Sequence, residues 1–304
     1  PLVMAAQAMS GIAKDLNKMS AKSAVRLLVP KGEAAKLYRW VAVLTGSKNT
    51  LKGVGFFLGG VLLEVLGFRG AIAVMAAILA VVWLFSVFTL QKDFGKSSGG
   101  AKFKNLFSKS HAVNCLSGAR LFLFAARDVW FVVALPVYLS SVLGWEHWAV
   151  GAFLACWVIG YGLVQTIAPG ITGRGRATVP DGKTAFGWAV ALLAVPALIA
   201  IAITSSEAVQ TSLILGLMAF GALFAVNSAL HSFLIISYAD EDGVSLDVGF
   251  YYMANAAGRL LGTVLSGWVF QTWGLSYCLW ISSAMIGVCA MMSLMLPKHG
   301  HRQT

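Results

Sequence analysis

The chain has 304 residues, of which 58% are hydrophobic and only 12% are charged, and its formal net charge is +11. Soluble domains carry about 25% charged residues, so this composition excludes an ordinary soluble domain. A basic nucleic-acid-binding domain is excluded as well, because its Lys and Arg side chains would lie among far more polar surface. Membrane topology therefore has to account for the positive charge.

Apolar segments long enough to cross a bilayer recur along the chain, since one spanning helix takes about 20 apolar residues. Residues 1–12 are predicted to be the end of a span, and a basic segment follows at 14–39. The chain start lacks the basic region and cleavage site of a signal peptide, so a truncated N-terminus is expected. Full spans are then predicted at 40–63, 70–90, 112–140, 148–168, 185–204, 209–236, 247–270 and 275–297.

The Lys and Arg residues divide the loops between these spans into two alternating classes. Of the 23, seventeen lie before the first full span, in the 91–110 and 169–184 loops, or in the C-terminal tail. The alternate loops together hold only Arg69. By the positive-inside rule, the basic loops and the C-terminus are predicted to be cytoplasmic. The remaining five cations lie within the predicted spans.

An internal repeat at a constant offset indicates the architecture. Each copy contains a Gly-rich span, a tight outer turn and a last span that returns to the cytoplasm, so the repeat is parallel, like the two halves of a major facilitator transporter. We predict an all-α integral membrane protein with that fold and twelve transmembrane helices when intact, of which this chain holds eight full spans and a partial one. At an offset of 207, Lys52, Gly55, Gly60 and Gly67 match Arg259, Gly262, Gly267 and Gly274.

The repeat also predicts the domain organisation. Residues 1–90 are expected to be the remainder of an N-terminal six-helix bundle, and 91–110 a basic cytoplasmic linker. Residues 111–304 are expected to form the complete C-terminal six-helix bundle.

Five cations inside the predicted spans are the main candidates for a binding site. A cation at the bilayer centre costs about 2.5–3.5 kcal/mol on insertion scales, so such residues are kept when they are paired or functional. Among the carboxylates, only Asp128 is clearly placed within a span and could balance these cations. The excess of positive charge predicts a cavity that binds an anion. The candidate substrate-binding cations are Lys48, Lys52, Arg120, Arg127 and Arg259.

A second interpretation stays open for each of these cations. Lys48, Lys52 and Arg259 could extend to the membrane interface, because each lies within a few turns of a span end, and Arg120 could lie near the inner interface as well. Arg127 could simply pair with its neighbour Asp128. The functional interpretation therefore depends on the set, and above all on Lys52 and Arg259 as repeat-related residues at the same depth.

Polar residues near the cations could complete the site, namely Tyr138, Asn227, His231 and Asn255. Hydrogen bonding between helices is the alternative role for each of them. For His231 the choice lies between such pairing and proton handling. Two pairs of glycines with small-xxx-small spacing, at 55 and 59 and at 258 and 262, predict close approach of helices.

Motifs of soluble enzymes are not found, and the chain is not expected to be an enzyme. The 95–97 segment ends like a phosphate-binding loop, but Leu90 occupies the place of its first glycine. The four isolated cysteines give no metal-binding pattern, so neither a metal site nor a cofactor is expected. Transport would then be driven by a gradient or by product formation, with Asp128 as the candidate residue for proton coupling.

Several segments resemble a known branch of the major facilitator superfamily. The 169–176 loop is similar to a degraded copy of the superfamily loop signature, with Gly173 where the family usually has Asp. The segments at 11–16, 18–23, 44–49 and 51–60 resemble the organoarsenical efflux family, and those at 127–131 and 135–138 extend the match.

This resemblance implies export of 1-arseno-3-phosphoglycerate for arsenate resistance. The expected functional partner is the glyceraldehyde-3-phosphate dehydrogenase that makes this product, and the expected location is a bacterial inner membrane. We expect a monomer in the lipid bilayer without a nucleic-acid partner. The alternatives are an exporter of another organic anion or a drug, or a membrane receptor or scaffold that does not transport.

Overall fold

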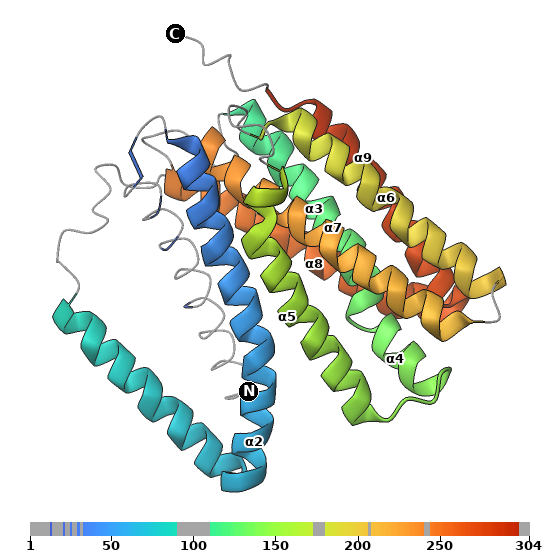
Figure 1. Ribbon diagram of the computed structural model, residues 1–304, viewed down its shortest axis with the longest axis horizontal. Coiled ribbons are helices and arrows are strands. Elements are labelled where there is room, and N and C mark those ends of the chain that lie inside the picture. The colour runs from blue at the N-terminus through green and yellow to red at the C-terminus, as the bar shows by residue number, and fades with distance from the viewer. Residues whose placement is uncertain are drawn as a thin grey trace.

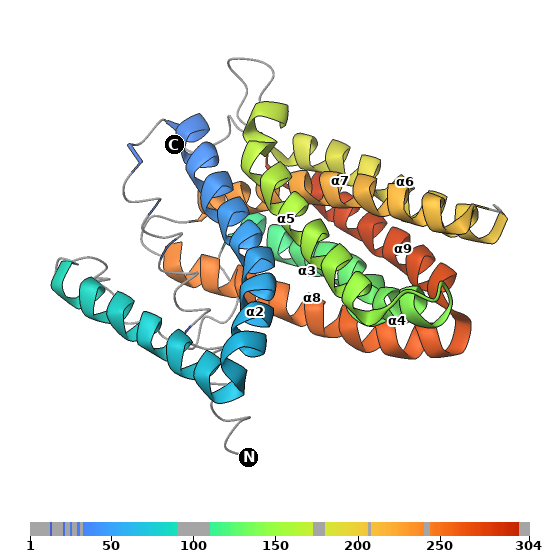
Figure 2. The same cartoon turned by 60° about the horizontal axis from the view of Figure 1, so that its bottom comes forward.

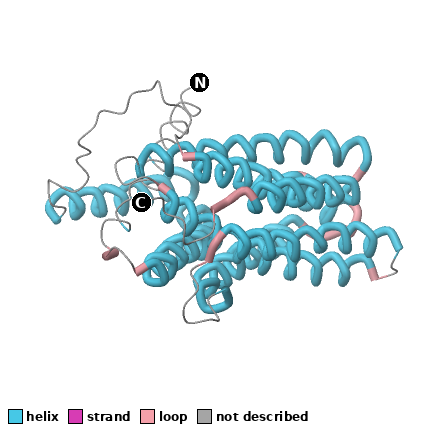
Figure 3. Tube along the Cα trace, turned by 90° about the horizontal axis from the view of Figure 1, so that it is seen from above, coloured by secondary structure: helices cyan, strands magenta, loops and turns pink. Residues whose placement is uncertain are grey.

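The computed structural model describes residues 33–89, 110–172, 180–205, 208–239 and 244–297, together with positions 13, 21, 25, 29 and 30. These residues are almost entirely helical, as Figures 1 and 3 show. The expected all-α class is therefore confirmed for the described residues. The helices are α2 (Ala34–Thr89), α3 (His111–Phe131), α4 (Ala134–Ser141), α5 (His147–Thr172), α6 (Gly182–Ser205), α7 (Val209–Tyr238), α8 (Val244–Trp273) and α9 (Leu275–Leu294).

Six helical segments in the described part of the chain are long and apolar enough to cross a membrane. The expected count of eight full spans is therefore not confirmed. The first part of α2 and the whole of α8 fall outside this set, and they are the helices that carry Lys48, Lys52 and Arg259. The expected partial span at 1–12, the linker, most of the basic 14–39 segment and parts of the other loops lie outside the described residues. The six segments are Val65–Thr89, His111–Ser141, His147–Thr172, Gly182–Ser205, Val209–Tyr238 and Leu275–Leu294.

The predicted 112–140 span is present, but it is interrupted between α3 and α4. Pro136 explains the position of the break, because its nitrogen cannot donate to the carbonyl of Val132 and its ring would clash with that group. The regular helical bonds resume when the Val137 nitrogen donates to the Val133 oxygen at 3.2 Å. The Ala134 nitrogen donates instead to Ser266 Oγ on α8, at 3.1 Å, so the break leaves this group satisfied.

Two repeat-related glycines form tight turns. Gly67 has φ 66° and ψ 177° where α2 reverses direction. Gly274 has φ 83° and ψ −176° between α8 and α9. Both conformations lie in the positive-φ region that favours glycine. The residues matched at an offset of 207 thus have the same backbone conformation.

Helices α3 to α9 form one packed bundle, and the first part of α2 lies along α5 (Figures 1 and 2). Trp130 of α3 lies at the centre and makes edge-to-face contacts with Phe220 of α7 and Trp157 of α5. Trp157 Nε1 also donates to the Leu217 oxygen at 2.8 Å. The segment Val65–Thr89, drawn in teal, diverges from this bundle in both views.

Glycines allow two pairs of helices to approach backbone to backbone. At Gly258 and Gly262 of α8, a Cβ atom would overlap the Leu121 and Ala125 carbonyl groups of α3, so this predicted motif does bring helices together. On α2 the expected pair, Gly55 and Gly59, has no heavy atom of the described residues within 4 Å of such a Cβ. The contact with α5 is made instead by other glycines, Gly46, Gly53 and Gly162.

We expect Gly258→Ala to lower the thermal stability of the detergent-purified protein. Its methyl group would meet the Leu121 backbone, and overpacking of this kind costs about 1–3 kcal/mol. Gly267→Ala is the matched control on the same helix, because a Cβ there meets open space. Melting curves of the two variants test the contact, and equal midpoints would contradict the close approach of α3 and α8.

Candidate functional site

A cavity of about 260 Å³ lies where the first part of α2 meets α3, α5, α7 and α8. All five cations predicted from the sequence line it, and none of the described lining residues is acidic. The structure therefore brings together cations that are up to 211 positions apart in the chain, Lys48 and Arg259. The lining residues are Ala21, Leu44, Thr45, Lys48, Asn49, Lys52, Arg120, Phe124, Arg127, Tyr161, Ser228, Tyr252, Asn255 and Arg259.

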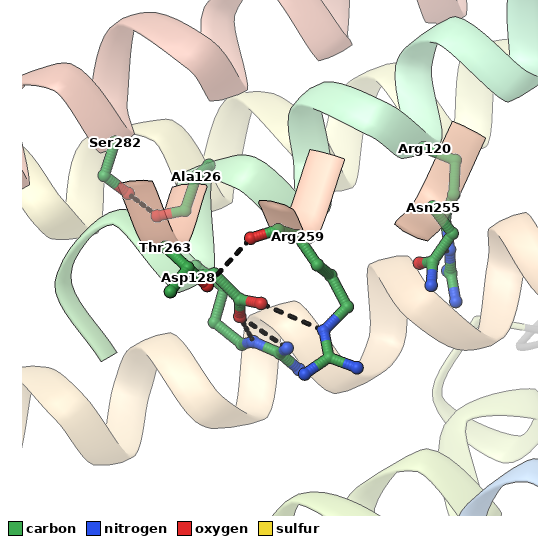
Figure 4. A network of polar contacts seen from close by, with 8 residues as sticks. Arg120, Ala126, Asp128, Asn255, Arg259, Thr263 and Ser282 are labelled. Carbon is green, nitrogen blue, oxygen red and sulfur yellow. Dashed lines mark hydrogen bonds and ion pairs between the residues drawn. The ribbon is translucent and has the colours of Figure 1, made fainter. Parts of the chain in front are cut away.

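Asp128 joins two of these cations. Its Oδ1 accepts from Arg127, at 2.6 Å from Nε and 2.5 Å from Nη2. Its Oδ2 accepts from Arg259 Nε at 3.0 Å (Figure 4). The Asp128 side chain is fully buried, whereas that of Arg259 is 48% exposed. The ion pair links α3 to α8 beside the cavity. Arg127 therefore both pairs with Asp128 and lines the cavity.

Arg120 is held in a different way, by neutral groups. Its Nε donates to Asn255 Oδ1 at 3.1 Å, and its Nη1 donates to Ser228 Oγ at 3.1 Å and to the Ser228 oxygen at 3.3 Å. Figure 4 shows Arg120 and Asn255 close together, well separated from Asp128. These dipoles orient the guanidinium without cancelling its charge, so Arg120 keeps its attraction for an anion in the cavity.

Phe124 separates the guanidinium groups of the two α3 arginines. Its ring centroid lies 3.9 Å from Arg120 Cζ and 4.9 Å from Arg127 Cζ. The ring face attracts both cations. Sequence analysis did not select Phe124, although its position four residues after Arg120 and three before Arg127 places all three on one helical face. That spacing was the signal that could have identified it.

A chain of hydrogen bonds connects the α2 wall of the cavity to Arg120. Asn49 Nδ2 donates to Gln165 Oε1 at 2.6 Å, and Gln165 Nε2 donates to Ser228 Oγ at 3.2 Å. Ser228 then contacts Arg120, so the chain runs through α2, α5, α7 and α3. The fully buried Gln165 was also missed by sequence analysis, and its amide within an otherwise apolar span was the available signal.

Three of the predicted site residues are not among those that line the cavity. Tyr138 lies on α4, beyond the break, and packs against the hydrophobic core. Asn227 uses Nδ2 to donate to the Trp188 oxygen of α6 at 2.9 Å, which is the interhelical role considered above, and to the Leu223 oxygen of its own helix at 2.9 Å. His231 is fully buried on α7. Of the polar candidates, only Asn255 lines the cavity.

The Asn49–Gln165 bond gives a testable measure of how α2 is attached. Hydrogen bonds between membrane helices contribute about 0.6 kcal/mol on average and up to about 1.7 kcal/mol. We expect a double-mutant cycle with Asn49→Leu and Gln165→Leu to show a coupling energy in that range. Unfolding by SDS in mixed micelles would measure it, and strictly additive single effects would contradict a direct bond.

Comparison with known proteins identifies the fold and leaves the family open. No family model matches the sequence, and no curated protein matches it either. Among solved structures, the chain is similar to the crystal structure of a bacterial homologue of the iron transporter ferroportin in its outward-facing state. The TM-score is 0.71 at 13% sequence identity, and the match covers 94% of this chain and 70% of the other.

An identity this low establishes likeness of fold alone. None of the comparisons supports the resemblance to the organoarsenical efflux family. The chain therefore shares the helical fold of this transporter homologue, and several of its helices are apolar enough to cross a membrane.

Proposed function

We propose that this protein is a secondary transporter that exports an organic oxyanion by alternating access. The observation that carries the proposal is the convergence of five cationic side chains on one cavity among the helices. The fold, shared with a transporter, supports the general class. In this proposal residues 1–90 and 111–304 belong to two halves joined by the 91–110 linker, and the cavity lies between them.

The chemistry of the cavity favours an anionic substrate over a metal cation. Arginine can bind a phosphate, arsenate or carboxylate through two parallel hydrogen bonds, and lysine adds a point charge. A divalent cation would be repelled by the same five side chains. The cavity volume of about 260 Å³ is just below the usual range for ligand pockets, about 300–1,000 Å³, which suits a small metabolite.

Among small oxyanions, we propose 1-arseno-3-phosphoglycerate as the substrate. The support is the sequence resemblance described above, together with the presence of an oxyanion group at each end of that molecule. A glyceraldehyde-3-phosphate dehydrogenase would make it inside the cell, and export through a bacterial inner membrane would confer arsenate resistance. The protein would act as a monomer with its C-terminus in the cytoplasm.

Inverted vesicles that contain the protein test this proposal. The substrate is generated outside the vesicles from phosphate-labelled glyceraldehyde 3-phosphate, arsenate, a nicotinamide cofactor and the dehydrogenase. We expect label to accumulate in these vesicles and not in vesicles without the protein.

Replacing arsenate by phosphate in the same assay produces the bisphosphorylated analogue. Accumulation of that product alone would favour another organic anion as the substrate. No accumulation of either product would defeat the transport proposal and favour a receptor or scaffold.

Arg120 provides a direct test of the cationic cavity. We expect Arg120→Gln to raise the apparent KM for the anion about 10- to 100-fold, because a hydrogen bond to a charged group contributes about 1.5–3 kcal/mol. Lys183→Gln, which removes an exposed charge at the start of α6, should change the KM less than about twofold. Initial uptake rates at equal protein levels measure both, and equal effects would contradict a binding role for Arg120.

A further inference from the structure

If the cavity binds an anion, the position of Asp128 indicates a second role for this residue besides ion pairing. We propose that Asp128 is an internal substitute for the substrate, a carboxylate that occupies the Arg127 and Arg259 guanidinium groups when the cavity is empty and is displaced when an oxyanion binds. The inference rests on the proposed function, and it identifies the residue that sets the affinity of the site.

The geometry of the ion pair is that of a bound oxyanion. Each carboxylate oxygen of Asp128 serves a different arginine, Oδ1 contacting Arg127 and Oδ2 contacting Arg259. A phosphate, arsenate or carboxylate group offers the same arrangement, two oxygens on one central atom. An incoming oxyanion could therefore take over both contacts without a new arrangement of the arginines.

The exposure of the three side chains indicates from which side an oxyanion reaches the arginines and replaces the Asp128 carboxylate. Asp128 is fully buried, Arg127 is 15% exposed and Arg259 is 48% exposed. Asp128 contacts Arg259 through Nε, and a guanidinium has four further N–H donors on its two terminal nitrogens. An oxyanion can therefore reach Arg259 from the cavity first and Arg127 second.

The packing around Asp128 places its Cβ against the α8 backbone. At Gly262 of α8, a Cβ atom would lie 2.9 Å from the Asp128 Cβ and 2.6 Å from the Ala125 oxygen. Asp128 can thus sit against the α8 backbone only because residue 262 is glycine. The carboxylate is held between α3 and α8, where its two oxygens reach an arginine from each helix.

Such a substitute is needed because unpaired charges are costly in surroundings of low polarity. Two cations in an empty cavity within a membrane are costly unless an anion lies beside them. Asp128 supplies this anion between transport cycles. The same carboxylate lowers the affinity for substrate, because the oxyanion has to displace it, and this competition favours release on the far side.

A binding titration on the full detergent-purified protein separates competition from a structural role. The probe is 3-phosphoglycerate, and calorimetry gives its Kd for the wild-type protein, Asp128→Asn and Asp181→Asn. Asp181→Asn is the matched control, because its Oδ1 caps the start of α6 through Thr184, and asparagine also caps helices well. We expect Asp128→Asn to lower the Kd tenfold or more, with the control within about twofold.

Transport assays with the same variants give the complementary measurement. We expect Asp128→Asn to lower both KM and kcat for uptake of 3-phosphoglycerate, because tighter binding slows release. A Kd that is unchanged or higher in Asp128→Asn would overturn the inference while leaving the proposed function standing. Absence of binding to the wild-type protein would overturn the displacement of Asp128 by a phosphate group, whereas the proposed function is decided separately by the vesicle assay with the arsenylated product.

Infrared difference spectroscopy keeps the proposal testable if Asp128→Asn does not fold. Addition of 3-phosphoglycerate to the wild-type protein should shift a carboxylate stretching band, because Asp128 loses its guanidinium partners. Asp128→Glu, which preserves the charge, should move that band and so assign it. A spectrum without such a ligand-induced change would overturn the displacement.

Discussion

The cost of charge in a low-polarity environment is the constraint that governs the centre of this structure. Arg120, Arg127 and Arg259 lie among apolar helices, and each has a different degree of compensation. Arg127 and Arg259 share one buried carboxylate, whereas Arg120 is surrounded by amide, hydroxyl and aromatic groups. The result is a cavity in which charge is tolerated but incompletely neutralised, which is the condition for binding an anion.

Backbone geometry makes this compensation possible. The α3 and α8 helices carry the ion pair, and the glycines at 258 and 262 allow these helices to approach within backbone contact. The short side chain of Asp128 can then contact an arginine from each of the two helices. The same principle applies on the other side of the cavity, where Gly46 and Gly162 bring α2 against α5 next to the Asn49–Gln165 hydrogen bond. Small residues therefore determine where polar side chains can pair.

Much of the site was predictable because a charged side chain inside a membrane span is costly in free energy, so the few that occur there are easily recognised. The five cavity cations were selected on that ground alone, and the turns at Gly67 and Gly274 followed from the repeat. The partners were harder to predict. Gln165 pairs with Asn49 across 116 positions, and no local pattern indicates which helices face each other.

Two further details that were not predicted from the sequence have local physical causes. Hydropathy averages over a window, so it did not resolve the interruption that Pro136 imposes on an otherwise continuous apolar segment. The glycine spacing at 55 and 59 matched a packing motif, but the side of α2 that packs against α5 is the one with Gly46 and Gly53. At the interruption before Pro136, the Ser266 hydroxyl replaces the acceptor that a continuous helix would have provided for the Ala134 N–H, so α8 supplies what the lipid cannot and the break is tolerated inside the bundle.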